Sequence, residues 1–268
     1  MFFLLNRNDR SGSIIQLMLY IYSFCYKHNI KYDGLFSDNA WWNNKLFFNN
    51  IFNYFGIQNS DNINKTTLQF IPFELLINLS TEEKQSSNLY SIFIVKEQCP
   101  YFTKNINYYF DESFKNFLLS KIKKNPFKSS NKILSVHIRR GDVNKTNVTR
   151  YTHDNTYLKL IEYITKNNQN VDIHIFSEKQ FNGNIKLYEN NKTTIHLSNE
   201  KGFNNFDKIF DDILFMIYSD YLIMSKSSFS YVAALLNKNI IYFNNKFWCG
   251  PLNNFLIYDD ITGEIIIS

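Results

Sequence analysis

Apolar and polar positions along the second half of the chain predict strands and helices in alternation. Short apolar runs with the length of buried strands occur at 133–138, 171–176, 194–197, 221–224 and 239–243. Between them, apolar residues recur at helical spacing in 154–167, 206–218 and 228–236, with Thr152 or Asp154 as the expected cap of the first helix. Strands alternating with helices of this length predict βαβ units and a parallel, doubly wound sheet.

The first half of the chain begins in a similar way. An apolar strand at 2–5 is followed by a loop at 10–13, an amphipathic helix at 14–28 and a strand at 31–36. This order places a turn at Gly12 and Ser13 beside a helix N-terminus and its unpaired amides. Farther along, the pattern is less regular, and we expect helices at 41–55 and 111–123 and strands at 68–71 and 91–95.

A polar, basic, proline-containing segment at 123–131 separates the two halves and is the candidate linker. The 268 residues suffice for two domains that each bury a core. We therefore predict an α/β protein with domains at 1–130 and 131–268. The second domain has the order of a Rossmann-like nucleotide-binding architecture but lacks the dinucleotide glycine fingerprint.

Composition argues against several functional classes. The 29 Lys and Arg residues against 24 Asp and Glu residues give a net charge of +5, an excess too weak for a nucleic-acid binder. The aromatic residues mostly fall at core spacing, so we expect no nucleic-acid partner. The 3 cysteines are far apart, which disfavours both a disulfide framework and a zinc cluster. No apolar run reaches the roughly 20 residues of a membrane span, and we expect a cytoplasmic protein without an integral membrane segment.

Candidate chemistry appears first at residues 137–142, which read His-Ile-Arg-Arg-Gly-Asp at the end of a predicted strand. Ligands of open α/β sheets bind beyond the carboxyl ends of the strands. Strand alternation places His137 and Arg139 on one face and Arg140 on the other, and Gly141 permits a sharp exit. Guanidinium groups bind phosphate through paired hydrogen bonds, so the pattern predicts an anion site. It is equally consistent with an arginine pair neutralised by Asp142 and solvent.

A second polar cluster follows the strand at 221–224. Residues 225–230 read Ser-Lys-Ser-Ser-Phe-Ser and lead directly into a predicted helix. Hydroxyl groups, unpaired amides and the positive end of the helix dipole would converge on a phosphate there, although the same serines also suit an ordinary N-cap. Upstream, Asp211 and Asp212 could accept hydrogen bonds from guanine or ribose, or belong to a solvated surface.

Together, the two segments resemble the superfamily of α1,2-, α1,6- and protein O-fucosyltransferases. His137, Arg139, Arg140 and Asp142 reproduce its H-x-R-R-x-D motif. Asp212 and the block 221–236 resemble its later acidic helix, apolar strand and serine-Phe-Ser turn. The closest likeness is to bacterial or viral α1,2-fucosyltransferases, whose turn commonly reads N-S-T-F-S-W-W-A-A where residues 226–234 read K-S-S-F-S-Y-V-A-A.

The resemblance covers residues 131 to 245 well and the start of the chain less well. The family opens with a G-x-G-N-Q turn, whereas residues 10–16 read R-S-G-S-I-I-Q. Ser13 therefore stands where the family has asparagine, and one glycine is missing. This departure favours an enzyme with a different acceptor or a relative without activity.

The resemblance implies a GT-B-like fold of two Rossmann-like domains with a cleft between them. It implies inverting transfer of L-fucose from GDP-β-L-fucose, without an essential metal or other cofactor, to a glycan acceptor bound largely by the first domain. Arg139 is the implied catalytic residue, stabilising the diphosphate. The implied donor-binding residues are His137 and Asp212 at the guanosine, Arg140 and Asp142 as braces of the loop, Ser227, Ser228, Phe229 and Ser230 at the β-phosphate, and Gly12 and Ser13 in the first domain.

The sequence does not decide which residue acts as the base for the acceptor hydroxyl. Some relatives carry a glutamate just after the motif, but residues 143–147 contain no carboxylate, and the nearest titratable groups are His153, Asp154 and Glu178. Two alternatives remain open, and the second is motivated by Ser13 and by the missing carboxylate. The chain could transfer another GDP-sugar, or it could be a non-catalytic module that still recognises a nucleotide or glycan.

Overall fold

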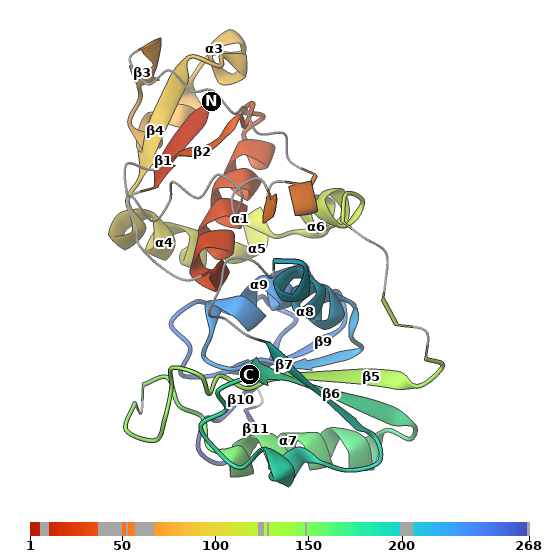
Figure 1. The fold of residues 1–268 in the computed structure, drawn as a ribbon. Coiled ribbons are helices and arrows are strands. Elements are labelled where there is room, and N and C mark those ends of the chain that lie inside the picture. The colour runs from red at the N-terminus through yellow and green to blue at the C-terminus, as the bar shows by residue number, and fades with distance from the viewer. Residues whose placement is uncertain are drawn as a thin grey trace. The chain divides into compact units, whose positions relative to one another are not determined.

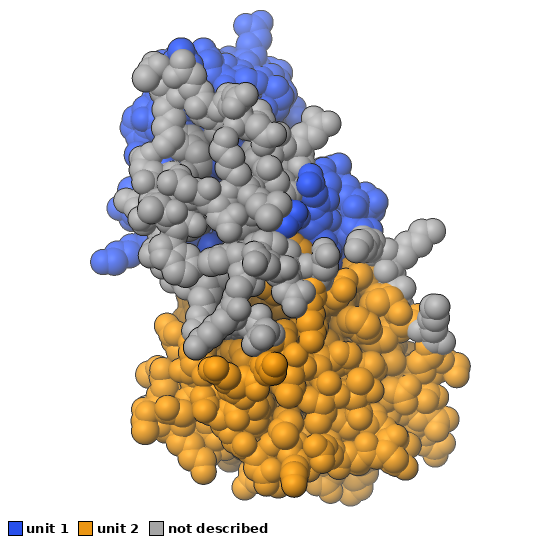
Figure 2. Space-filling view, viewed as in Figure 1, with its two compact units in different colours: residues 1–123 blue, residues 124–268 orange. Residues whose placement is uncertain are grey.

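The computed structural model describes residues 1–5, 11–36, 50–51, 53–56, 67–122, 126–127, 129–147, 149–198 and 206–266. The chain divides into two compact units, residues 1–123 and 124–268, which are coloured separately in Figure 2. The sequence placed this boundary after residue 130. Each unit has a parallel sheet and helices, so the predicted α/β class is confirmed. Most of the helix expected at 41–55 and part of the linker lie outside the described residues.

The first unit contains a four-stranded parallel sheet in the order β2-β1-β4-β3. Its strands are β1 (Phe2–Leu5), β2 (Gly34–Phe36), β3 (Gln69–Phe70) and β4 (Leu89–Phe93). Its described helices of five residues or more are α1 (Ser11–Lys27), the 3-10 helix Phe73–Asn78, α3 (Thr81–Gln85), α4 (Val95–Lys104) and α6 (Glu112–Leu119), and the single turn α5 (Ile106–Tyr109) lies between the last two.

Aromatic side chains form much of the core of this unit. The ring of Tyr20 on α1 stacks on Phe102 of α4 with 4.8 Å between the centroids, and Phe24 lies 4.5 Å from Phe73. Large rings bury much apolar area per residue, so a short sheet with few strands still acquires a core.

The first unit differs from the predicted elements in several places, among them the strand expected at 91–95, which ends at Phe93. Helix α1 begins at Ser11, so Gly12 and Ser13 belong to its first turn and not to a preceding loop. Helix α4 was not predicted, and it contains Pro100, a residue that ordinarily signals the end of a helix.

The second unit contains a seven-stranded sheet in the order β11-β10-β9-β8-β5-β6-β7, parallel except for the β10–β11 pair. Its strands are β5 (Lys132–His137), β6 (Val171–Glu178), β7 (Thr193–Ser198), β8 (Tyr221–Ile223), β9 (Ile240–Asn244), β10 (Leu256–Tyr258) and β11 (Ile265–Ile266). Its helical elements are α7 (Asp154–Asn167), the 3-10 helix Ile185–Tyr188, α8 (Phe206–Tyr218) and α9 (Ser228–Leu236). Figure 1 shows α7 on one face of this sheet and α8 and α9 on the other.

The strand order of the second unit fixes where a ligand would bind. From β5, the chain adds β6 and β7 on one side, and then β8, β9 and β10 on the other. The order therefore reverses between β5 and β8, and such a switch point leaves a crevice beyond the carboxyl ends of the two strands. Residues 138–142 leave β5 at this edge, and residues 224–227 leave β8 there.

Candidate active site

The two segments singled out in the sequence lie together at the switch point. His137, the last residue of β5, shares a hydrogen bond of 2.8 Å between its Nδ1 and Oγ of Ser225, which follows β8. The His137 ring also lies 5.3 Å from the ring of Phe229 in the first turn of α9. Two segments nearly 90 positions apart in the chain thus form one edge of the sheet.

His137 is buried at this contact and is neutral at neutral pH. Burial lowers the pKa of its imidazole to about 4, with Glu178 opposing this effect and Arg139 adding to it. A neutral imidazole can donate one hydrogen bond and accept another. It can therefore connect the serine turn to a ligand group without adding charge.

Arg139 is half-buried and held in a fixed plane. Its Nε donates to Oδ1 of Asp142 at 3.0 Å and its Nη2 donates to Oδ2 at 2.7 Å. The Arg139 side chain is 15% exposed and that of Asp142 is 23% exposed. A two-point contact of this kind fixes the orientation of the guanidinium while leaving part of it accessible.

Arg140 is fully buried and braces the loop. Its Nη2 donates to the backbone oxygen of Thr152 at 2.6 Å and to Oδ1 of Asp154 at 2.8 Å, and its Nη1 donates to the backbone oxygen of Arg139 at 3.1 Å. Its guanidinium lies 4.1 Å from the ring centroid of Tyr151. The charge of Arg140 is thus compensated inside the protein by Asp154.

The carboxylate of Glu178, at the end of β6, holds the backbone of the same loop. Its Oε2 accepts hydrogen bonds from the backbone N–H groups of Arg140 and Gly141, both at 2.9 Å. A Cβ on Gly141 would lie 2.8 Å from Cβ of Glu178, so only glycine permits this approach.

The three candidate bases differ in their surroundings. Glu178 and Asp154 are both engaged with the motif loop, and Asp154 also accepts a hydrogen bond of 2.7 Å from the hydroxyl of Tyr188. His153 is exposed, with its ring 5.1 Å from that of Tyr151. His153 is also the N-cap residue of α7 without a side-chain capping bond, so the expected cap by Thr152 or Asp154 is wrong.

The serine turn forms the start of α9. Ser227 is the N-cap residue, and its Oγ accepts a hydrogen bond of 3.3 Å from the backbone N–H of Phe229. Oγ of Ser230 donates to the backbone oxygens of Ser227 and Ser225 at 3.3 and 3.5 Å. Ser227, Ser228 and Ser230 are buried. An anion at this end of the sheet would therefore meet the helix N-terminus, with its amides and dipole.

The remaining candidates lie elsewhere. Asp212 is buried on α8 beside Ser198 at the end of β7, and burial raises the pKa of its carboxyl to about 7, partly opposed by Lys208 and Ser198. Gly12 and Ser13 lie in the first unit, in α1.

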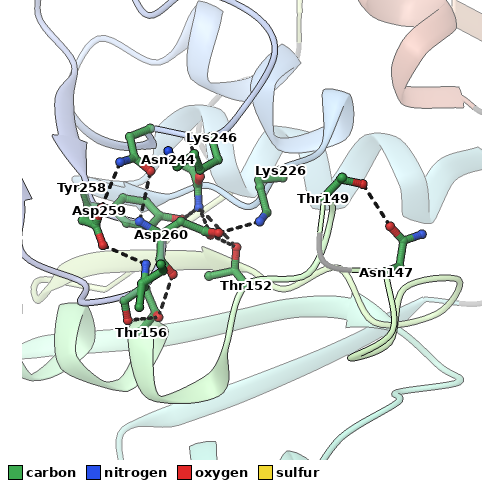
Figure 3. A network of polar contacts seen from close by, with 12 residues as sticks. Asn147, Thr149, Thr152, Thr156, Lys226, Asn244, Lys246, Tyr258, Asp259 and Asp260 are labelled. Carbon is green, nitrogen blue, oxygen red and sulfur yellow. Dashed lines mark hydrogen bonds and ion pairs between the residues drawn. The ribbon is translucent and has the colours of Figure 1, made fainter.

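Sequence reasoning missed a buried ion pair behind the serine turn. Nζ of Lys226 lies 2.6 Å from Oδ2 of Asp260, a residue between β10 and β11 (Figure 3). The sequence did contain one signal, because Lys226 stands between an apolar strand and an apolar helix and its ammonium therefore requires a partner. It contained nothing to select that partner among the carboxylates.

Comparison with known proteins gives the family. The model of glycosyl transferase family 11 matches residues 97–251. The chain belongs to this family. The match confirms that the protein is a glycosyltransferase and agrees with the fucosyltransferase motifs of the second unit. A comparison with curated proteins finds no match.

Several solved structures are similar at low identity. NodZ α-1,6-fucosyltransferase co-crystallized with GDP is 12% identical, with 99% of this chain and 97% of that chain covered and a TM-score of 0.49. NodZ soaked with GDP-fucose is 13% identical, with 100% and 99% covered and a TM-score of 0.48. A mutant of Arabidopsis thaliana FUT1 in complex with GDP is 12% identical, with 96% and 70% covered and a TM-score of 0.45. Within the described residues of this chain, no helix has both the length and the apolar character needed to cross a bilayer.

Proposed function

We propose that this family 11 enzyme transfers L-fucose from GDP-β-L-fucose to a glycan hydroxyl, with inversion at the anomeric carbon and formation of an α1,2 linkage. The observation that carries the proposal is the contact between His137 and Ser225 at the switch point of the second sheet. It brings the H-x-R-R-x-D loop and the α9 N-terminus to one edge, where each offers positive charge or partial charge to a diphosphate.

In the proposed reaction, the acceptor oxygen attacks the anomeric carbon of fucose while the bond from that carbon to the β-phosphate oxygen breaks. The electron pair of this bond leaves with GDP, so negative charge grows on the β-phosphate. Arg139 and the N-terminus of α9 stabilise that growing charge, which favours the transition state over bound substrate. The proposal includes no metal ion, because these two groups carry the electrostatic role.

The other residues of the second unit serve this arrangement in different ways. Asp142 fixes the plane of the Arg139 guanidinium, and Arg140 and Glu178 hold the loop from inside. His137 and Asp212 face the guanosine in this proposal. Because its pKa is raised to about 7, Asp212 would be mainly a carboxylate, which only accepts hydrogen bonds, above neutral pH.

The proposal assigns no side chain as base. Glu178 and Asp154 are bound to the motif loop, so their carboxylates already have partners within the protein. A loose, oxocarbenium-like transition state needs little base assistance, because the acceptor hydroxyl loses its proton late, and the proton then passes to solvent water. The acceptor glycan would bind largely to the first unit.

Transfer assays with a glycan array test the proposal. The wild-type protein with GDP-fucose should fucosylate at least one glycan, and Arg139→Ala should lower the rate about a hundredfold, the usual cost of removing one such stabilising group. Arg150→Ala, which removes an exposed arginine from the same loop region, is the matched control and should keep the rate.

The outcomes separate the alternatives. Product from another GDP-sugar but not from GDP-fucose would reassign the donor. GDP binding without product on any glycan would favour the non-catalytic module. Ser13 and the missing carboxylate in 143–147 are the features that motivate this alternative.

A further inference from the structure

We propose that Asp260 is a positioning residue of the donor site, which acts through the buried Lys226 to set where the N-terminus of α9 lies relative to the Arg139 loop. The inference rests on the proposed function, since the site that it concerns is the donor site. Asp260 lies beyond residues 97–251, the region that the family model matches. The family match therefore does not assign it any role.

The ammonium group of Lys226 is buried behind the serine turn. Its side chain is 3% exposed and that of Asp260 is 13% exposed, with 2.6 Å between Nζ and Oδ2. A charged amine so far from water requires an opposite charge close by. Lys226 stands between Ser225, which binds His137, and Ser227, which caps α9. The Asp260 carboxylate therefore holds the middle of the turn through the side chain of Lys226.

The Asp260 carboxylate is itself held in place by neighbouring side chains. Oδ1 accepts hydrogen bonds from Oγ1 of Thr152 at 2.6 Å and from Nδ2 of Asn244 at 2.7 Å (Figure 3). The Asp260 backbone N–H donates to Oδ1 of Asn245 at 3.1 Å, and the Asp260 backbone oxygen accepts from Oγ1 of Thr156 at 3.0 Å. Contacts from the α7 region and from the end of β9 thus fix both the backbone and the side chain of Asp260.

Thr152 connects Asp260 to the loop that carries Arg139 and Arg140. The backbone oxygen of Thr152 accepts the 2.6 Å hydrogen bond from Arg140, the neighbour of Arg139. Arg140, Thr152, Asp260 and Lys226 therefore form one continuous path from the motif loop to the serine turn. This path is separate from the direct contact between His137 and Ser225. Supporting contacts of this kind hold the two halves of a site in a fixed geometry, which favours binding of a diphosphate between them.

Two variants separate positioning from stability. Asp260→Asn leaves the buried ammonium without its counter-charge and should lower the melting temperature. Adding Lys226→Met removes the second charge as well, so no uncompensated charge stays buried and the lost stability should largely return. We expect the double variant to melt near the wild-type temperature and yet to bind GDP at least about tenfold more weakly, measured by calorimetry on folded protein.

A matched control uses another ion pair of the second unit. Lys132 at the start of β5 and Asp220 just before β8 lie 2.8 Å apart at the opposite edge of the sheet. Lys132→Met with Asp220→Asn makes the same chemical change far from the serine turn. This control should leave the dissociation constant for GDP unchanged.

The dissociation constant of the double variant decides the question. Wild-type affinity for GDP in the double variant, or an equal loss in the control, would overturn the positioning role of Asp260. A wild-type protein that binds no GDP would instead overturn the proposed function, and this inference with it. The two failures are therefore distinguishable from the same set of titrations.

Discussion

Arg139 and Arg140 are adjacent in the sequence but meet different kinds of partner. Arg140 is fully buried and bound to Asp154 and to backbone oxygens, so its charge serves the fold. The Arg139 side chain is 15% exposed and bound to Asp142 at the edge of the sheet, so it is less enclosed than Arg140. Both residues follow the last residue of β5, so their different partners, and not their place in a strand, account for the difference.

This difference predicts unequal losses of stability. Arg140→Met leaves Asp154 without its buried counter-charge and should lower the free energy of unfolding by about 3 kcal/mol. Arg139→Met removes a half-buried pair at the edge of the sheet and should cost about 1 kcal/mol or less. Urea denaturation of both variants measures the contrast, and equal losses would show that Arg140 is not the internal brace.

At the scale of elements, the packing of α8 against the end of β7 buries one carboxyl group, that of Asp212. Its surroundings raise the pKa to about 7, mainly by desolvation. Above its ordinary pKa of about 4, the unfolded chain releases this proton while the folded protein keeps it. The contribution of Asp212 to the free energy of unfolding therefore falls as the pH rises from about 4 to about 7, and is constant above that.

Asp212→Asn tests this pH dependence. The amide does not titrate, so the variant should gain stability relative to the wild type as the pH is raised from 5 to 8, by on the order of 2 kcal/mol. Asp211→Asn, an exposed neighbour on the same helix, is the control and should show no such trend. A stability difference that does not change with pH would contradict the raised pKa.

The sequence predicted the elements of the second unit better than those of the first. The bounds of α7, α8 and α9 are those expected at 154–167, 206–218 and 228–236, because each has a regular apolar pattern between clear strands. Helix α4 escaped prediction because of Pro100, and the start of α1 was placed too late because Gly12 and Ser13 read as a turn.

The candidate site, too, could be predicted from the sequence only in part. Its two motifs are local and could be found in the sequence, and their residues occupy adjacent strand ends. The side chains that hold them, Glu178 and Asp260, come from β6 and from the turn after β10. Their partners are selected by strand order and register, which depend on pairing between distant segments. Local patterns therefore indicated where a ligand binds, but not what keeps that place rigid.

At the scale of the whole molecule, the described contacts among the motif loop, the serine turn and Asp260 all lie within the second unit. The second unit should therefore carry donor recognition, while the mild positive charge of the chain, +5, favours an anionic ligand in general. The family match spans parts of both units, from residue 97 to residue 251.

Calorimetric titration of the intact protein with GDP and with UDP tests the central claim most directly. GDP should bind at least about tenfold more tightly than UDP, and Arg139→Ala should weaken GDP binding by at least about tenfold while Arg150→Ala does not. Equal affinity for UDP would contradict the assignment of a GDP-sugar as donor. Unchanged GDP binding by Arg139→Ala would contradict the claim that Arg139 and the start of α9 hold the diphosphate.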